Sequence, residues 1–226
     1  MQFTYYGQSC FSIQIAGKQL LFDPFITGNS LAADIDIQQI KADYIFVSHG
    51  HFDHVADLIT IAKNTNATVV AAFEITEWCS QQGIEKVHPL NLGGKWNFSF
   101  GTVKFVPAAH SSVLPDGTYG GAAGGFVFTT QEGNFYYSGD TALMLDMQLI
   151  PRYAKIDTAI LSIGDNFTMG AEDAILAAGF IECNRIIGVH FDTFDYIKID
   201  HEKTLKQFSD AGLQLTLPTI GATINL

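Results

Sequence analysis

Side chains that bind metal ions are concentrated in one short segment of this sequence, Ser48–His54, which reads Ser-His-Gly-His-Phe-Asp-His. Its three imidazoles and one carboxylate supply the nitrogen and oxygen donors that zinc and similar ions prefer. In an extended chain, side chains at positions i and i+2 point to the same side, so His49 and His51 can bind one ion together. A chance surface cluster or a tag would lack regular elements on both sides. We therefore predict a metal site.

The elements that flank this segment predict a second metal position beside the first. Tyr44–Val47 is an apolar run that predicts a strand, and Val55–Ala62 carries apolar side chains at i, i+3, i+4 and i+7, which predicts a helix. The helix is expected to begin near Asp53, whose carboxylate suits the positive end of the helix dipole. The change from strand to helix turns Asp53 and His54 away from the two preceding histidines. Two adjacent metal positions are therefore expected.

Apolar runs elsewhere in the chain also end at polar or metal-ligating residues. Runs that predict strands are followed by His110, Asp140, the pair Asp165-Asn166, and His190. In layered α/β folds, binding sites gather at the ends of strands. We predict an α/β fold with two strand-rich halves and helices outside them, an αββα sandwich with these strand ends along one edge.

Turn residues and hydrophobic spacing predict the remaining elements. These are an antiparallel meander within residues 1–26, a strand at 67–72, helices at 74–82 and 171–182, hairpins at 95–107 and 126–138, strands at 158–163, 186–189 and 213–217, and a helix capped by Asp200. The alternation of strands and helices after the histidine-rich segment indicates a parallel section of sheet.

Length and composition indicate a globular chain of one domain, residues 1–226. Hydrophobic residues make up 47% and charged residues 15% of the 226 residues, as in ordinary soluble α/β domains. No apolar run approaches the roughly 18 residues of a membrane span, and the N-terminus lacks the features of an export signal. Cys10, Cys79 and Cys183 are odd in number and widely spaced, so free buried thiols are expected. We predict a cytoplasmic protein with no membrane partner.

The charge balance disfavours nucleic acids as partners. Twelve Lys and Arg residues against 23 Asp and Glu residues give a formal net charge of −11, which repels a polyanion over most of the surface. Bound divalent cations would offset that charge locally, so a small anionic substrate can still be attracted to the site. The expected partner is a small molecule.

The spacing H-x-H-x-D-H at His49–His54 resembles the signature of the metallo-β-lactamase superfamily. This resemblance implies the αββα metallo-β-lactamase fold and a first metal site of His49, His51 and His110. It further implies a second site of Asp53, His54 and His190, with Asp140, in Ser-Gly-Asp-Thr, as the carboxylate that bridges the two. Without the resemblance, His110 and His190 would be read as core or loop histidines, and Asp140 as a turn residue.

A narrower resemblance covers nearly the whole chain. Tyr6–Phe11, Gly120–Phe126 and Ile163–Gly170 resemble segments of the uncharacterised metal-dependent hydrolases related to the L-ascorbate-6-phosphate lactonases. One departure lies in the first of these segments, where relatives usually carry histidine in Gly-His-Ser and this chain carries Gln8. An amide does not titrate, so acid–base chemistry at position 8 is not expected.

The resemblance implies hydrolysis with two divalent metal ions. Zinc is the expected metal, with manganese or iron as alternatives. Two ions lower the pKa of a bridging water to give hydroxide, and one of them polarises a carbonyl or phosphoryl oxygen. Asp53 is the expected catalytic residue, because its free oxygen can orient the nucleophile. We predict a hydrolase of a small ester, lactone or phosphoester; the substrate and any homo-oligomeric state stay open.

Three other functions share these ligands. An RNA-processing nuclease of the same superfamily would need a basic surface, which the acidic balance argues against. The di-iron oxidoreductases of the superfamily carry glutamate where this chain has His51, so the histidine favours hydrolysis. A non-catalytic metal-binding relic is disfavoured by the complete ligand set.

Several residues near the predicted site have two readings each. Asp165 and Asn166 are either hydrogen-bonding partners of a ligand histidine or caps of the helix near Gly170. Gly120–Gly125 is either a closely approached loop beside the substrate or a series of tight turns. Phe191, Phe194 and Tyr196 are assigned either to a pocket wall or to core packing, and Thr141 is a candidate partner of the bridging carboxylate.

Overall fold

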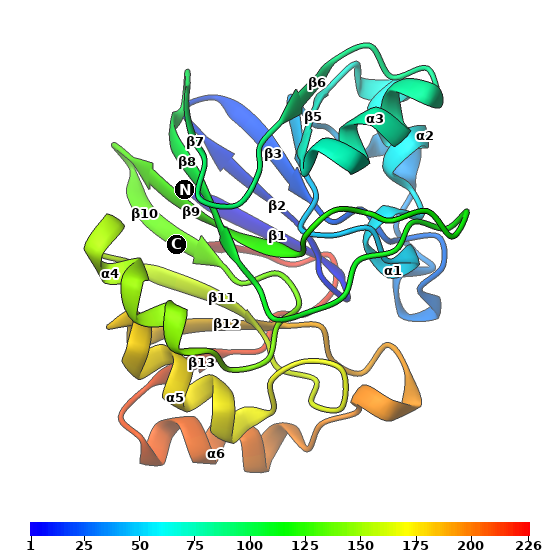
Figure 1. The fold of residues 1–226 in the computed structure, drawn as a ribbon. Helices are drawn as coiled ribbons and strands as arrows, with labels where there is room; N and C mark the ends of the chain where they lie inside the picture. The colour runs from blue at the N-terminus through cyan, green and yellow to red at the C-terminus, as the bar shows by residue number, and fades with distance from the viewer.

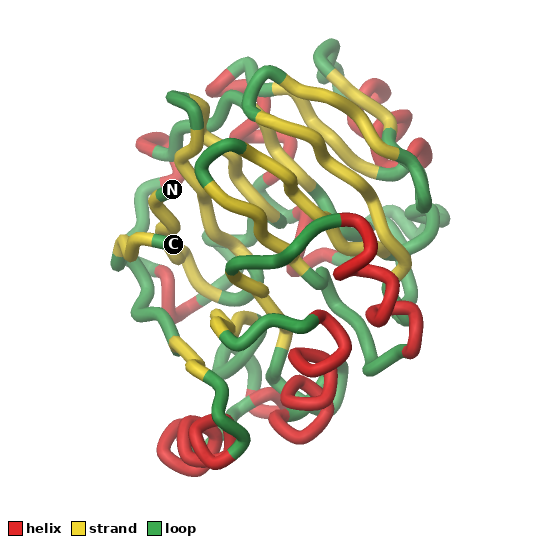
Figure 2. The backbone as a smooth tube through the Cα atoms, turned by 90° about the vertical axis from the view of Figure 1, so that its left-hand side faces the viewer, coloured by secondary structure: helices red, strands yellow, loops and turns green.

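Two β-sheets form the centre of the molecule, and helices lie against their outer faces (Figures 1 and 2). The computed structural model describes all residues, 1–226. Figure 2 shows the strands as two layers with helices on both outer sides, so the predicted αββα sandwich is confirmed.

The first sheet is mixed, and its parallel half lies next to the predicted metal-binding segment. In spatial order it contains β14 (Thr223–Asn225), β1 (Gln2–Gly7), β2 (Cys10–Ile15), β3 (Lys18–Phe22), β4 (Tyr44–Phe46), β5 (Thr68–Ala71) and β6 (Val87–Pro89). Pairing is antiparallel from β14 to β3 and parallel from β3 to β6, as the alternation of strands and helices predicted.

The second sheet is the counterpart of the first. Its strands are, in spatial order, β13 (Gln214–Thr216), β12 (Arg185–Val189), β11 (Thr158–Ser162), β10 (Gly133–Tyr137), β9 (Gly124–Thr130), β8 (Gly101–Pro107) and β7 (Lys95–Phe98). Pairing is parallel from β13 to β10 and antiparallel from β10 to β7, so β8, β10, β11 and β12 all run in one direction.

The helices divide between the two outer faces (Figure 1). On the side of the first sheet are α1 (Phe52–Val55), α2 (Leu58–Thr65) and α3 (Phe73–Gln81); on the side of the second are α4 (Ile150–Tyr153), α5 (Ala171–Ile181) and α6 (His201–Asp210). Short 3₁₀ helices occur at Ser30–Ala32, Ile37–Gln39, Leu145–Leu149 and Asp195–Ile197. None of the helices has the length and apolar character that a membrane span requires.

Aromatic rings fill the space between the sheets and set their relative position. Phe22 and Phe46 of the first sheet lie 5.3 Å apart between ring centroids, and Phe46 meets Phe128 of the second sheet edge-on at 5.0 Å. Phe11 meets Tyr137 across the same interface at 5.0 Å. Edge-to-face contacts between fully buried rings add directional preference to the hydrophobic packing. The two sheets are therefore held so that their strand ends meet along one edge.

The helix predicted from Asp53 through Ala62 is wrong as a single element. The chain leaves the helix at Asp57, which separates α1 from α2. The buried carboxylate of Asp57 accepts hydrogen bonds from the backbone N–H groups of Ile26, at 2.6 Å, and Thr27, at 2.9 Å. These bonds to the loop after β3 outweigh the local helical pattern, which contains no sign of them.

The sequence pattern also missed the last strand. The predicted final strand near Leu213–Leu217 is present as β13, but the chain then turns back and β14 pairs with β1, placing Phe3 opposite Ile224. The two termini consequently lie close together (Figures 1 and 2). Pairing between the two ends of a chain leaves no local trace in sequence. The prediction of free buried cysteines is confirmed for all three.

Candidate metal centre

Four strand ends carry candidate metal ligands to one edge of the sandwich. His49 follows β4 in the first sheet, whereas His110, Asp140 and His190 follow β8, β10 and β12 in the second. The three strands of the second sheet run in the same direction, so their ends meet at the same edge. The structure thereby brings together all seven of the side chains that the sequence predicted as ligands.

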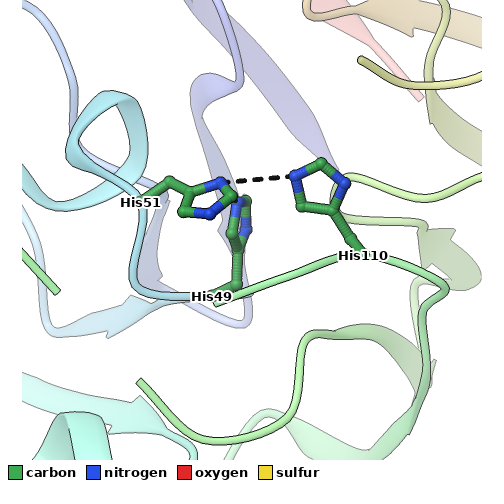
Figure 3. Close-up of side chains that lie close together, drawn as sticks. All are labelled: His49, His51 and His110. Carbon is green, nitrogen blue, oxygen red and sulfur yellow. Dashed lines mark hydrogen bonds between the residues drawn. The ribbon is translucent and has the colours of Figure 1, made fainter. Parts of the chain in front are cut away.

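Three imidazoles converge in a first cluster. Nδ1 of His51 lies 3.0 Å from Nε2 of His49 and 3.3 Å from Nε2 of His110 (Figure 3). Ligand atoms around a tetrahedral zinc ion, at metal–nitrogen distances of 2.0–2.1 Å, are separated by about 3.3 Å. Burial lowers the pKa of all three imidazoles, so at neutral pH they are uncharged and their lone pairs are available. The cluster therefore fits one metal ion.

A carboxylate-rich second cluster lies beside the first. Oδ2 of Asp140 is 2.9 Å from Nε2 of His190 and 3.2 Å from Nε2 of His54. Oδ2 of Asp53 is 3.5 Å and 3.6 Å from the same two nitrogens. Two oxygens and two nitrogens at these separations also match the edges of a tetrahedron around one divalent ion.

The carboxylate of Asp140 belongs to both clusters. Its Oδ2 lies 4.0 Å from Nε2 of His49 and 3.8 Å from Nε2 of His110, in addition to its contacts with the second cluster. Its Oδ1 accepts a hydrogen bond from the hydroxyl of Ser162, at 3.1 Å. Oδ2 therefore has the position that a bridging ligand requires.

The second cluster attracts positive charge. Burial by itself would lower the pKa values of His54 and His190, but the neighbouring carboxylates, Asp140 foremost and Asp53 with it, together outweigh burial. They raise the pKa of His54 well above its usual range and that of His190 to about 9. Burial opposes ionisation of Asp140, yet the two histidines hold the pKa of this carboxyl well below its usual range. Without a metal ion, protons on the histidines neutralise the carboxylates, and a divalent cation can replace them.

A residue that the sequence reasoning missed anchors this cluster. Asp23, fully buried after β3, places Oδ2 2.8 Å from Nδ1 of His54 and accepts hydrogen bonds from the backbone N–H of Ser48, at 2.7 Å, and from the hydroxyl of Tyr137. Carboxylates in this position fix the tautomer and orientation of a ligating imidazole. The available signal was its place directly after an apolar strand, as at His49 and Asp140.

Hydroxyl groups contact the outer nitrogens of two other histidines. Oγ of Ser48 is 3.0 Å from Nδ1 of His49, and Oγ of Ser111 is 3.2 Å from Nε2 of His51. Thr141, a candidate partner of Asp140, instead accepts a hydrogen bond from the backbone N–H of Ala109, at 3.0 Å. It therefore joins the loop of Asp140 to the loop of His110.

Asp165 and Asn166 neither hydrogen-bond to a ligand histidine nor cap the helix α5, so neither of the two predicted roles is found. Both adopt left-handed conformations, with φ of 61° and 48°, in the turn before α5, and the carboxylate of Asp165 accepts from the backbone N–H of Asn166, at 2.8 Å. The carboxylate makes no hydrogen bond or ion pair with a candidate ligand histidine. Gly170 is the N-cap of α5, and no side chain caps the helix. These two residues therefore shape a turn, and Asp23 is the partner of a ligand histidine.

The glycine-rich segment 120–125 packs against the backbone of the histidine-rich segment. A Cβ atom on Gly120 would lie 3.3 Å from Cα of Gly50 and 2.5 Å from Oγ of Ser112. The backbone N–H of Gly124 donates to the carbonyl of Ser48, at 3.1 Å. Close backbone approach therefore accounts for glycine here.

The aromatic residues in the segments that carry the candidate ligands divide between the core and the surface. Phe191 is buried and stacks on Tyr5, so it belongs to the core. Phe52, which lies between two candidate ligands in sequence, is 59% exposed and packs edge-on against Phe25, which also contacts the partly exposed Phe194. We refer to Phe25, Phe52 and Phe194 as the aromatic patch.

Comparison with known families identifies the chain. The model of the beta-lactamase superfamily domain matches residues 18–191. The chain belongs to this superfamily. Two curated relatives are UPF0173 metal-dependent hydrolases, one from Flavobacterium johnsoniae and one from Christiangramia forsetii; they are 55% and 53% identical to this chain, with complete coverage of both chains in each case. The superfamily resemblance is thus confirmed, and this chain is a member of a family of metal-dependent hydrolases.

Solved structures share the fold. Igni18, a metallo hydrolase from Ignicoccus hospitalis, is 28% identical, with a TM-score of 0.88 and coverage of 99% of this chain and 97% of that one. An isothiocyanate hydrolase from Delia radicum gut bacteria has a TM-score of 0.81 at 18% identity, with coverage of 100% and 99%. CmlA, a diiron β-hydroxylase from Streptomyces venezuelae, has a TM-score of 0.74 at 13% identity and is covered over 54% of its length. The last two show the fold alone, and the lactonase relation stays a prediction.

Proposed function

We propose that this protein is a dinuclear metal-dependent hydrolase that acts on a small ester or lactone. The observation that carries the proposal is the position of Asp140, whose Oδ2 lies within 4.0 Å of histidine nitrogens from both clusters. One carboxylate oxygen shared by two clusters that both contain histidine nitrogens is an arrangement suited to two ions close together.

The residues of the centre have separate roles in this proposal. His49, His51 and His110 would hold the first ion, Asp53, His54 and His190 would hold the second, and Asp140 would be shared between them. Two divalent ions held there would supply activation of water near neutral pH and polarisation of the substrate carbonyl. Oδ2 of Asp53 faces the second position, while its Oδ1 has no hydrogen-bond partner in the structure and can accept a proton from the attacking water. Zinc fits the donor set, and manganese and iron are the alternatives.

The surroundings of the centre favour an uncharged substrate over a phosphoester. Of the 12 Lys and Arg residues in the chain, only Lys198 lies in the segments that contain the candidate ligands, residues 47–57, 108–123, 138–149 and 190–200. Its ammonium group is paired with Asp195, at 2.6 Å. The aromatic patch offers exposed ring surface instead, at Phe52 and Phe194. An ester or lactone with an apolar substituent therefore matches these surroundings better than a phosphate group or an RNA strand does.

The test is a substrate screen with defined metal content. Metal-free protein is reloaded with Zn²⁺, Mn²⁺ or Fe²⁺ and assayed against aryl and alkyl esters, lactones, phenethyl isothiocyanate as another uncharged electrophile, and bis(p-nitrophenyl) phosphate. We expect turnover of an ester or lactone at two ions per chain. Folded protein with two bound ions and no turnover of any of these compounds would contradict the proposal.

A further inference from the structure

The turn between β1 and β2 holds a buried amide against the second cluster. Gln8 is completely buried, and its Nε2 donates a hydrogen bond to Oδ2 of Asp53, at 2.9 Å. A carboxylate oxygen can only accept, so the amide nitrogen faces Asp53. This oxygen of Asp53 is the one that faces the imidazoles of His54 and His190. Gln8 therefore contacts the metal-facing atom of a candidate ligand.

The main chain of Gln8 is also held in place. Its carbonyl accepts hydrogen bonds from the hydroxyl of Tyr5, at 2.9 Å, and from the backbone N–H of His190, at 2.8 Å. Burial raises the pKa of Tyr5, so its hydroxyl keeps the proton that it donates. Gln8 is thus joined to Asp53 through its side chain and to His190 through its backbone, and its position is fixed from three directions.

Asp53 needs such a partner more than the other residues of its cluster do. Its side chain is 22% exposed, whereas those of His54, Asp140 and His190 are at most 3% exposed. Asp53 lies in α1, a helix of only four residues without a side-chain cap. Gln8 is the only neutral side chain that donates to it. Without this bond, the carboxylate could rotate and present either oxygen, or neither, to the second position.

We propose that Gln8 is a positioning residue for the second metal position. It holds Asp53 so that Oδ2 points at that position and Oδ1 stays free to act on the nucleophile. This inference rests on the proposed dinuclear function. The amide neither gains nor loses a proton in the working pH range, so it supports Asp53 equally across that range.

Titration of the metal-free protein with Co²⁺ tests this role without a substrate, because the visible spectrum of Co²⁺ reports each position. Wild-type protein is expected to bind two equivalents. Gln8→Met keeps the length of the side chain but removes the donor; the first equivalent should bind unchanged and the second 10–100-fold more weakly, as is typical when a partner of a ligand is removed. Gln8→His, which supplies an N–H donor, should recover most of the loss, and no recovery would count against a donor role.

A double-variant cycle separates positioning from a general structural effect. If Gln8 acts through Asp53, then Gln8→Met should change the second affinity by less than about twofold in an Asp53→Ala background. Three outcomes would overturn the inference. In Gln8→Met alone, these are an unchanged affinity for the second Co²⁺ or an equal loss of affinity for both Co²⁺ ions. In the Asp53→Ala background, it is a further loss of affinity for the second Co²⁺. If Gln8→Met lowers the melting temperature by more than about 4 °C, Gln8→Asn repeats the test with a shorter amide.

The titration also distinguishes this inference from the proposed function. Two equivalents in wild-type protein with no effect of Gln8→Met would contradict the role of Gln8 alone. Fewer than two equivalents in wild-type protein would contradict the dinuclear proposal, and the inference about Gln8 with it.

Discussion

At the scale of single residues, several of the candidate ligands have a second group that fixes their direction. Asp23 contacts His54, Ser162 contacts Asp140, and Gln8 contacts Asp53. His110, Asp140 and His190 were predicted as ligands through the family resemblance. The candidate ligands within His49–His54 could be predicted directly, because donor type and spacing are local properties. Their partners could not, because Asp23 is 31 positions from His54 and Ser162 is 22 positions from Asp140. Only folding brings such pairs together.

Replacement of the bridging carboxylate should remove activity and one metal ion. Asp140→Asn keeps the size of the side chain but loses the negative charge that faces both clusters, so we expect occupancy of about one ion per chain and at least 10²-fold lower turnover. Elemental analysis and ester hydrolysis measure the two effects. Asp146→Asn, an exposed change a few residues further along the chain, is the matched control. Two ions and normal turnover in Asp140→Asn would contradict the bridging assignment.

Replacement of Asp23 should weaken the second metal position without changing any ligand. In Asp23→Asn, an amide replaces a carboxylate that accepts from His54, Ser48 and Tyr137, so some of these donors lose their partner. We expect a 10–100-fold loss of affinity for the second ion and a lower melting temperature. The exposed Asp34→Asn serves as the control in both measurements. Unaltered metal affinity in Asp23→Asn would show that His54 is oriented by other contacts.

At the scale of elements, the break between α1 and α2 positions the centre. Asp57 joins this break to the loop after β3, which also contains Phe25 of the aromatic patch. The apolar spacing predicted the helices, since that spacing is a local property. It could not predict the break, because the hydrogen bonds that cause it come from a loop about 30 positions earlier, as seen for Thr27.

Removal of the Asp57 carboxylate should destabilise the fold. Asp57→Ala leaves the backbone N–H of Ile26 and of Thr27 without their acceptor inside the protein, and we expect the free energy of unfolding to fall by about 2–4 kcal/mol. Urea denaturation measures the change, with Asp34→Ala as an exposed control expected to stay within about 0.5 kcal/mol. A loss as small as that of the control would mean that water replaces these bonds.

The aromatic patch should determine preference for apolar substrates. Phe52→Ala removes an exposed ring beside the centre, so KM for an aryl ester should rise by about tenfold, the effect of roughly 1.4 kcal/mol of lost contact, with kcat and the KM of a small alkyl ester little changed. Steady-state kinetics on the two esters test this. Leu176→Ala, an exposed apolar change on α5, is the control. A rise of KM by the same factor for both esters would show that the ring of Phe52 does not contact the aryl substituent.

At the scale of the whole molecule, the two sheets contribute different ligands to one centre. His49 comes from the end of β4 in the first sheet, whereas His110, Asp140 and His190 come from the second. A metal ion bound at these residues would therefore connect the two halves of the sandwich. Because an ion binds the folded protein and not the unfolded chain, it stabilises by mass action, about 4 kcal/mol at a free concentration 1,000 times the dissociation constant.

Removal of metal should consequently lower the melting temperature. We expect EDTA-treated protein to melt several degrees below protein saturated with Zn²⁺, and Asp140→Asn to lose most of this difference. Differential scanning calorimetry at a fixed free Zn²⁺ concentration measures both. Equal melting temperatures with and without Zn²⁺ would contradict binding between the two halves.

The stability of the metal-free protein should fall as pH rises from about 6.5 to 9. The pKa of His190 is raised to about 9 against an ordinary value of 6.5, so its proton stabilises the folded state fully below 6.5 and this contribution is lost as pH rises through 9. Melting temperatures of EDTA-treated protein across this range should decrease, and His190→Gln should decrease less. Identical slopes in the two proteins would remove His190 as the cause.

The sequence by itself predicted the candidate ligands and a metal-dependent chemistry, and it predicted the αββα architecture that the structure confirms. Donor spacing in Ser48–His54, hydrophobic periodicity and strand ends are all local patterns, and each constrains the structure without knowledge of the rest of the chain. Only the tertiary structure decided which groups surround the ligands. The roles of Asp23, Gln8 and Asp57 depend on hydrogen bonds between segments that are distant in sequence. Such bonds form because buried polar groups must find partners wherever the packed sheets place them.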